Sequence, residues 1–256
     1  MPVPNESAGS GSEAVQKTQA ISGLQENTTY HFRIVASNVD GTVYGKDESF
    51  KTKTGTGGQL GSMAVTEPFD GSSSSLANFN ANWAALGWAS GTPAKGEDTT
   101  SGWRTVAAYP TVNGAYYNST VTDTGSGIAA VATMAVNPGS TNRYFSVWLD
   151  MGTPSSTRVG YELRFTNVAT NSYSVTLSKW QSGSQTVLAS QASYSLVNGN
   201  SFAVVDQGST VSAWTNTGSG FSQLLNASDS AFSSGKSAIE DSGNITRLTN
   251  FKTGSL

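Results

Sequence analysis

The chain has 256 residues, of which only 12% are charged, and a formal net charge of −3. This charge gives no electrostatic basis for binding nucleic acid, and no run of 18 apolar residues predicts insertion into a membrane. The chain has no cysteine, which excludes disulfides, thiolate zinc sites and a cysteine nucleophile. Gly, Ser, Thr and Asn are abundant, which indicates short strands joined by polar turns and therefore an all-β fold.

The first predicted elements lie between residues 30 and 50. From Tyr30 to Ala36 apolar residues occupy every second position, which predicts a strand with one buried face. An Asp-Gly turn follows at 40–41, and the next strand is expected to end near Phe50. His31, the only histidine of the chain, is expected on the outward face of the first strand.

The stretch ISGLQENTTYHFRIVASNVDGTVYGKDESFKT, residues 21–52, resembles the second half of a fibronectin type III domain. Leu24 and Tyr30 match the leucine and tyrosine of its tyrosine corner, where the phenolic hydroxyl bonds to nearby backbone. A whole sandwich of this type takes roughly 100 residues. We therefore expect residues 1–52 to form a partial domain with exposed edges, whose missing strands come from upstream in the same gene or from another chain.

A linker and a larger β domain are predicted next. The stretch KTKTGTGGQLGS, residues 51–62, is rich in Gly and Thr, and we predict a flexible linker over 53–63. Residues 64–256 are expected to form a large antiparallel sandwich or jelly roll without a helix. The β-rich runs are 127–136, 144–151, 159–166, 173–180, 186–190, 201–206, 210–214, 221–225 and 245–251.

The order of segments in this second domain resembles the laminin-G-like, concanavalin-A-like jelly roll of secreted bacterial proteins and some phage tail proteins. The resemblance implies an extracellular, cell-surface or virion-surface location, although the first residues show no signal-peptide pattern. It also implies that Trp83 and Trp103 are core residues. The segments that carry it are EPFDGSSSSLANFNANW (67–83), GYELRF (160–165), YSVTLSKWQSGSQTVLA (173–189) and DSAFSSGKSAIEDSGNITRLTNF (229–251).

The sequence shows no catalytic constellation in the larger domain. Its lack of histidine excludes a Ser-His-Asp triad. Jelly-roll glucanases that resemble this fold carry three acids on one strand, spaced Glu-x-Asp-x-x-Glu, and no such strand is present. Alternation places Glu162 opposite the apolar residues, near Arg164. The pairs 97–98 and 240–241 are interpreted as solvated surface acids, and we predict that the protein is not an enzyme.

Aromatic residues are the candidates for glycan binding, because sugar C–H faces stack on rings while hydroxyls bond to planar polar groups. Trp148 and Trp180 lie opposite the apolar faces of their strands, so they could line the concave sheet. The alternative is that all these aromatics pack in a two-layer core. The candidates are Trp88, Tyr109, Tyr117, Trp148 and Trp180.

A structural calcium ion is the one cofactor considered, because hard oxygen ligands suffice for it. Related sandwiches often join the first strand to the last in this way, and the candidate ligands are Glu67, Asp70 and Asn250. Only two of these carry carboxylates, and Asn250 stands where the resemblance leads us to expect an acid.

The leading hypothesis is a non-catalytic extracellular module that binds a glycan or cell-surface polysaccharide, or mediates adhesion. An alternative is a structural subunit of a phage tail or extracellular filament. Its half sandwich would be completed by other copies or by strands from another chain. A polysaccharide-active enzyme is a third reading, which the missing carboxylate pattern disfavours.

Overall fold

The computed structural model describes residues 6–10, 13, 15–19, 21, 24–25, 28–52, 54–67, 69, 82–86, 95–98, 102–105, 113–152, 157–242 and 246–256. Most of these residues are in antiparallel strands, and the chain divides into two compact units, Met1–Gly55 and Thr56–Leu256. No helix among them is long and apolar enough to cross a membrane. Three sequence candidates, Trp88, Tyr109 and Asp70, lie outside the described residues.

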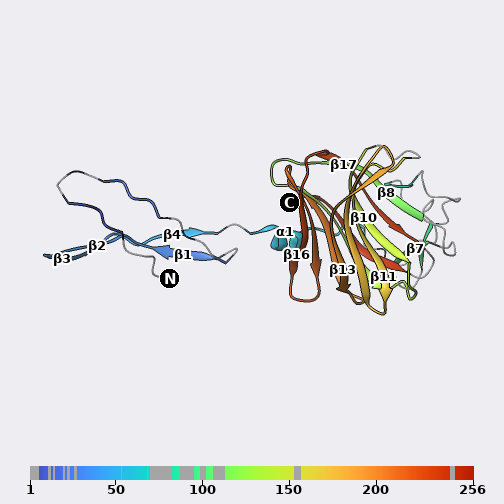
Figure 1. The fold of residues 1–256 in the computed structure, drawn as a ribbon, viewed down its shortest axis with the longest axis horizontal. Coiled ribbons are helices and arrows are strands. Elements are labelled where there is room, and N and C mark those ends of the chain that lie inside the picture. The colour runs from blue at the N-terminus through green and yellow to red at the C-terminus, as the bar shows by residue number, and fades with distance from the viewer. Residues whose placement is uncertain are drawn as a thin grey trace. The chain divides into compact units, whose positions relative to one another are not determined.

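The first unit consists of two separate antiparallel ribbons (Figure 1). The predicted strand over 30–36 is interrupted between Phe32 and Val35. The predicted Asp-Gly turn is confirmed, and the Asn38 side chain accepts the N–H groups of Asp40 and Gly41 at 2.9 and 3.1 Å. The strands are β1 (Thr29–Phe32) paired with β4 (Glu48–Lys51), and β2 (Val35–Asn38) paired with β3 (Gly41–Tyr44).

Most apolar side chains of this unit are exposed. Val43 is 71% exposed and Tyr44 is 60% exposed, because each ribbon has only two strands and no second layer among the described residues of this unit. The Tyr30 hydroxyl accepts the N–H of Gln25 at 2.8 Å, five residues upstream, which is the kind of contact expected of a corner tyrosine.

The second unit is an antiparallel sandwich of two seven-stranded sheets (Figure 1). The first sheet runs β13 (Ser184–Ser195), β12 (Ser172–Gln181), β11 (Gly160–Ala169), β10 (Tyr144–Met151), β17 (Ser234–Asp241), β8 (Asn113–Thr122) and β5 (Trp83–Ala85). The second sheet runs β16 (Phe221–Ser228), β15 (Thr210–Asn216), β14 (Ser201–Asp206), β9 (Ile128–Val136), β18 (Arg247–Ser255), β7 (Gly102–Thr105) and β6 (Lys95–Asp98).

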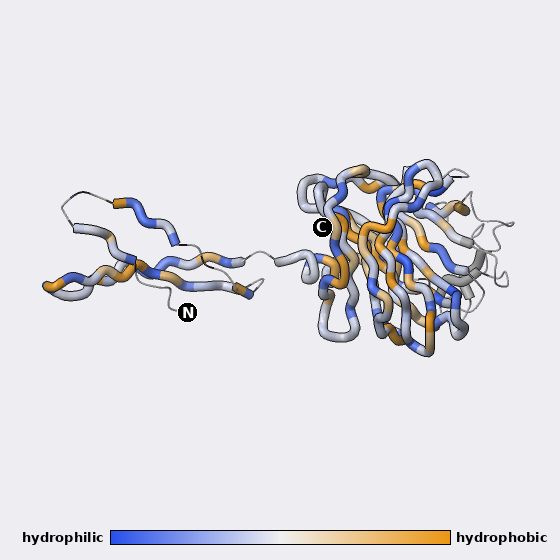
Figure 2. Tube along the Cα trace, in the orientation of Figure 1, coloured by the Kyte–Doolittle hydropathy of each residue, from blue (hydrophilic) through white to orange (hydrophobic). Residues whose placement is uncertain are grey.

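The core lies between the two sheets, where apolar residues from alternate positions meet. Runs of hydrophobic residues on these strands are orange in Figure 2. Phe145 and Phe165 of the first sheet stack at 5.3 Å between ring centroids, and Phe202 of the second sheet contacts both rings at 5.1 Å. Trp83 contacts Phe251 at 5.1 Å and is 6% exposed, so the expected burial of Trp83 is confirmed.

A short helix, α1 (Thr56–Ser62), lies where the sequence predicted a flexible linker over 53–63. Leu60 is fully buried against Val131 and Val205 on the side of the second sheet that faces away from the core. Gly57 permits close approach, because a Cβ there would lie 2.5 Å from the Phe221 carbonyl oxygen. The structure therefore differs from the predicted boundary: the compact unit begins at Thr56, because Leu60 adds to an apolar strip on the sheet.

Candidate functional site

The face of the first sheet that points away from the second sheet carries a group of polar and aromatic side chains. On β10, Phe145, Val147 and Leu149 belong to the core between the sheets, so Tyr144 and Trp148 lie on the opposite face. We call this the outer face. It also carries Glu162 and Arg164 of β11, which confirms the prediction that Glu162 lies opposite the apolar residues and near Arg164.

Strand register brings two carboxylates to this face from different strands. Glu162 of β11 pairs across the sheet with Trp148 of β10, and Glu240 of β17 pairs with Ser146 of β10. Strand β10 therefore lies between the two acids. The neighbouring strand β12 contributes Trp180 on the other side of Glu162.

Glu162 is held on both carboxylate oxygens. Oε1 lies 2.8 Å from Arg164 Nε and 2.7 Å from Arg164 Nη2, and Oε2 accepts the indole N–H of Trp180 at 2.8 Å. Burial raises the pKa of Glu162 above its ordinary value, and the Arg164 guanidinium opposes this rise. These donors compensate for the removal of the carboxylate from water.

Glu240 forms the second half of the network. Its Oε1 accepts the Tyr144 hydroxyl at 2.8 Å and Arg158 Nη2 at 2.7 Å. Its Oε2 is buried and has no hydrogen-bond partner among the described residues. Burial, followed by the charge of Glu240, raises the pKa of Tyr144, so the phenol keeps its proton and remains a donor.

The guanidinium groups join the two halves through aromatic rings. Arg164 lies over the Tyr144 ring at 3.9 Å, and Arg158 lies over the Trp180 ring at 4.9 Å. Each arginine thus contacts one carboxylate and one aromatic ring. We call the six residues the outer-face network: Tyr144, Arg158, Glu162, Arg164, Trp180 and Glu240.

The arginines of the outer-face network are partly exposed to solvent, and its glutamates are not. The side chains of Arg158 and Arg164 are 23% and 18% exposed, whereas those of Glu162 and Glu240 are fully buried. Any ligand at this face therefore meets guanidinium groups before it meets a carboxylate.

The sequence candidates for sugar stacking are buried. Trp148 is 0% exposed and Trp180 is 8% exposed, and their rings lie 6.1 Å apart in a cluster with Leu86. Tyr117 packs on the Trp83 ring at 5.5 Å, within the core between the sheets. Trp148 and Trp180 are on the predicted face, but none of the three described candidates presents an open ring. The alternative, that all these aromatics pack in a two-layer core, describes Tyr117, whereas Trp148 and Trp180 are buried in a separate cluster on the outer face.

The interpretation of residues 240–241 as solvated surface acids is wrong, because Glu240 and Asp241 are both fully buried. Tyr144 and Arg158 were not among the site residues predicted from the sequence. The alternation of Ile239 and Glu240 along their strand could have indicated that Glu240 lies on the face opposite the core. Arg158 lies outside any strand, so alternation gives no information about its position.

The calcium candidates are only partly described. Glu67 pairs with Phe251 through main-chain hydrogen bonds of 2.8 and 3.0 Å, so backbone contacts join the segment around Glu67 to the last strand. Glu67 Oε1 accepts the N–H of Phe69 at 3.4 Å, and Asn250 is exposed. Within the described ranges, no three His, Cys, Asp or Glu side chains form a group that could hold a metal ion.

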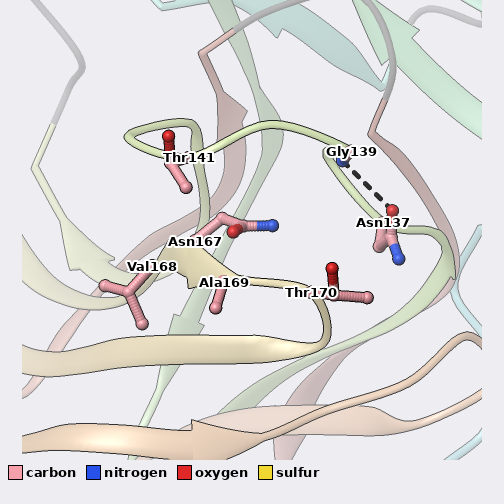
Figure 3. Close-up of a pocket in the computed structure, with 7 residues that line it drawn as sticks. All are labelled: Asn137, Gly139, Thr141, Asn167, Val168, Ala169 and Thr170. Carbon is pink, nitrogen blue, oxygen red and sulfur yellow. Dashed lines mark hydrogen bonds between the residues drawn. The ribbon is translucent and has the colours of Figure 1, made fainter.

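An open pocket of about 460 Å³ lies between the loop 137–141 and the turn of the β11–β12 hairpin (Figure 3). Its volume suits a small ligand. Its described lining has amide, hydroxyl and small apolar groups but no aromatic ring or charged side chain, so it offers nothing for sugar stacking. The lining residues are Asn137, Gly139, Thr141, Asn167, Val168, Ala169 and Thr170.

Comparisons with known proteins show the fold. No family model matches the chain, and no curated protein sequence matches it. The VIP36 exoplasmic/lumenal domain, in its Ca²⁺/Man3GlcNAc-bound form, is 9% identical with a TM-score of 0.51, over 72% of this chain and 89% of that one. A mutant of the GH43 protein BlXynB from Bacillus licheniformis is 11% identical with a TM-score of 0.50, over 86% of this chain and 45% of that one.

The carbohydrate-binding module CBM66 from Bacillus subtilis is 14% identical with a TM-score of 0.49, over 67% of this chain and 94% of that one. At these identities the likeness extends to the fold alone. The larger unit is an antiparallel jelly-roll sandwich, as the sequence predicted.

Proposed function

We propose that the larger unit is a non-catalytic glycan-binding module whose ligand binds at the outer face, beside Arg158 and Arg164. The observation that carries this proposal is the rigid placement of two partly exposed guanidinium groups. Glu162 holds Arg164 over the Tyr144 ring, and Glu240 holds Arg158 over the Trp180 ring.

Such an arrangement is chemically suited to sugar hydroxyls. A guanidinium has five N–H donors in a fixed fork, and the side chains of Arg158 and Arg164 remain 23% and 18% exposed beside their buried carboxylates. Donors held in place beforehand lose less conformational entropy when a ligand binds. The fold itself accommodates glycans elsewhere, since the similar VIP36 domain was solved with Man3GlcNAc.

Binding is favoured over hydrolysis. Glycoside hydrolysis takes one accessible carboxylic acid and one accessible carboxylate, placed on either side of the scissile bond. Glu162 and Glu240 are both fully buried, and each contacts an arginine. Neither is placed to give a proton to a leaving group. Turnover of any substrate on a polysaccharide panel would contradict this proposal.

A glycan array with the purified chain tests the function, and lysine variants test the site. Arg158→Lys and Arg164→Lys retain the charge but remove the planar fork, so we expect about 10-fold weaker binding or more from each. Arg33→Lys is the matched control, because Arg33 also lies over a tyrosine ring, at 4.7 Å from Tyr44. An array without bound glycans would reject the function, whereas unchanged affinity of both site variants would reject only the site.

The surface of the first unit favours assembly as a second candidate function. Val43 and Tyr44 are largely exposed, and Ile34 is 76% exposed. Within the described part of this unit, each two-stranded ribbon also has unpaired edges that can accept further strands. We propose that this unit is part of a fibronectin-type sandwich, completed by strands of other copies in a filament, a phage tail or a cell-surface assembly. Mass photometry over a range of concentrations tests this, and a particle that stays monomeric throughout would exclude it.

A further inference from the structure

Strand β10 changes its direction of side-chain alternation at Asp150. Because Leu149 points into the core, regular alternation would send the next side chain to the outer face. Asp150 instead has φ +55°, and the register with β17 shifts between Trp148 and Met151. A bulge of this kind redirects a side chain.

Glycines on both neighbouring strands make room for the bulge. A Cβ at Gly160 of β11 would lie 2.7 Å from the Leu149 carbonyl oxygen. A Cβ at Gly235 of β17 would lie 2.5 Å from the carbonyl carbon of Asp150. Both close approaches depend on the absence of a side chain.

The bulge brings the Asp150 carboxyl within hydrogen-bonding reach of Asp206, which lies on β14 of the opposite sheet. Asp150 is 1% exposed and Asp206 is 0% exposed. In the part of the chain that the structure describes, neither carboxylate oxygen of Asp150 has a hydrogen-bond partner, and neither has Oδ2 of Asp206. Oδ1 of Asp206 accepts the N–H of Gly208 at 2.9 Å.

The surroundings of the pair are negative. Asp123 adds its charge to both acids, and Asp229 adds its charge to Asp206. Lys179 Nζ lies 2.5 Å from Asp229 Oδ2, so its charge is engaged there. The Tyr161 hydroxyl donates to Asp229 Oδ1 at 2.7 Å.

Two facing carboxyl groups, both buried and with three of their four oxygens lacking a donor, are costly to leave ionised. Burial raises the pKa of Asp150 to about 8, and the neighbouring Asp206 carboxyl and the charge of Asp123 add to the rise. A shared proton removes half of the negative charge of the pair, whereas one divalent cation neutralises it. A hard cation also satisfies the three oxygens without partners, whereas one proton joins only two of them.

We propose that Asp150 and Asp206 bind one calcium ion, which joins the two sheets of the sandwich. Two carboxylates are enough acidic ligands if main-chain carbonyl oxygens and water supply the rest, because calcium accepts six to eight oxygens in a flexible geometry. Magnesium suits the pair less well, since it demands octahedral geometry and retains several waters. These residues differ from the calcium ligands that the sequence suggested.

Calorimetric titration of the chelator-treated chain with CaCl2 tests the proposal. We expect one site per chain and a higher melting temperature in CaCl2 than in EDTA at pH 7.5. Asp150→Asn and Asp206→Asn keep the side-chain shape but remove a charge, so each is expected to weaken calcium binding about 10-fold or more. Asp40→Asn, at an exposed position of the first unit, is the matched control and should bind like the wild type.

Two results would overturn the proposal. One is the absence of binding heat at millimolar CaCl2, together with equal melting temperatures in CaCl2 and EDTA, which would leave a shared proton as the partner of the pair. The other is unchanged affinity in both asparagine variants, which would place the ion elsewhere. If a variant does not fold, the comparison of wild-type protein with and without chelator still decides.

Discussion

Trp180 donates its indole N–H to Oε2 of Glu162, on the neighbouring strand, at 2.8 Å. Glu162 is fully buried, so this bond and the Arg164 guanidinium replace the water that the carboxylate lost on folding. The same indole ring supports Arg158. Trp180 therefore stabilises both halves of the outer-face network, and its role here is structural rather than that of an open stacking surface.

Trp180→Phe should lower the free energy of unfolding by about 1.5–3 kcal/mol, because a donor to a charged group is lost and a buried acceptor is left unsatisfied. Trp214→Phe is the matched control. The Trp214 indole donates to a neutral hydroxyl, Ser212 Oγ, at 2.9 Å, so its loss should lower the free energy of unfolding by about 0.5–1.5 kcal/mol. Urea denaturation measures both values, and equal losses would show that the charge of Glu162 does not matter.

Gly57→Ala should destabilise the sandwich by about 1–3 kcal/mol, because the new Cβ would meet the Phe221 carbonyl oxygen at 2.5 Å and displace α1. Gly61→Ala lies on the same helix with nothing within 4 Å of the added Cβ. Because alanine is a better helix former than glycine, Gly61→Ala should raise the free energy of unfolding by up to about 1 kcal/mol. Chemical denaturation should show a lower free energy of unfolding for Gly57→Ala and a higher one for Gly61→Ala. Changes of the same sign in both variants would contradict the packing of α1.

Leu60→Ala should lower the free energy of unfolding by about 2–5 kcal/mol, as is typical when a fully buried leucine is truncated. The expected loss follows from the contact of Leu60 with Val131 and Val205, which a flexible linker would not make. Val65→Ala serves as the comparison, because Val65 is 47% exposed and should change stability by less than about 0.5 kcal/mol. Similar melting temperatures for the two variants would contradict the packing of Leu60 and would favour the predicted flexible linker over 53–63.

Stability in EDTA should fall as the pH rises from 5 to 8. The pKa of Asp150 is 3.8 in an unfolded chain and about 8 in the folded protein, so the folded state holds this proton more tightly. Its stabilising contribution is complete below pH 3.8 and is lost progressively until the pH passes about 8. Urea midpoints at pH 5 and 8 measure the fall, and Asp150→Asn should flatten it. Equal urea midpoints at pH 5 and pH 8 in the wild-type protein would contradict the raised pKa of Asp150.

Strand patterns in the sequence were enough to predict much of the larger unit. Alternation placed strands at 144–151 and 159–166, and β10 and β11 occupy Tyr144–Met151 and Gly160–Ala169. The same alternation put Glu162 on the face opposite the core. These predictions succeed because a strand exposes successive side chains to opposite faces, whatever its neighbours are.

The partners of those residues depended on tertiary structure. Glu240 is 78 positions after Glu162 in the numbering, and only the placement of β17 beside β10 brings it to the same face. The covering of Trp148 by Leu86 likewise joins segments far apart in the chain. Alternation cannot show which strands are neighbours, because register and sheet order arise from packing between distant segments.

By itself, the sequence determined an all-β chain with a larger sandwich, one core-facing set of apolar residues, and a polar set on the opposite face. Only the tertiary structure decided which acids are buried, where the helix α1 packs and how Asp150 turns toward Asp206. The physical reason is that composition and periodicity act along a single strand, whereas burial, bulges and ion pairs result from contacts between strands.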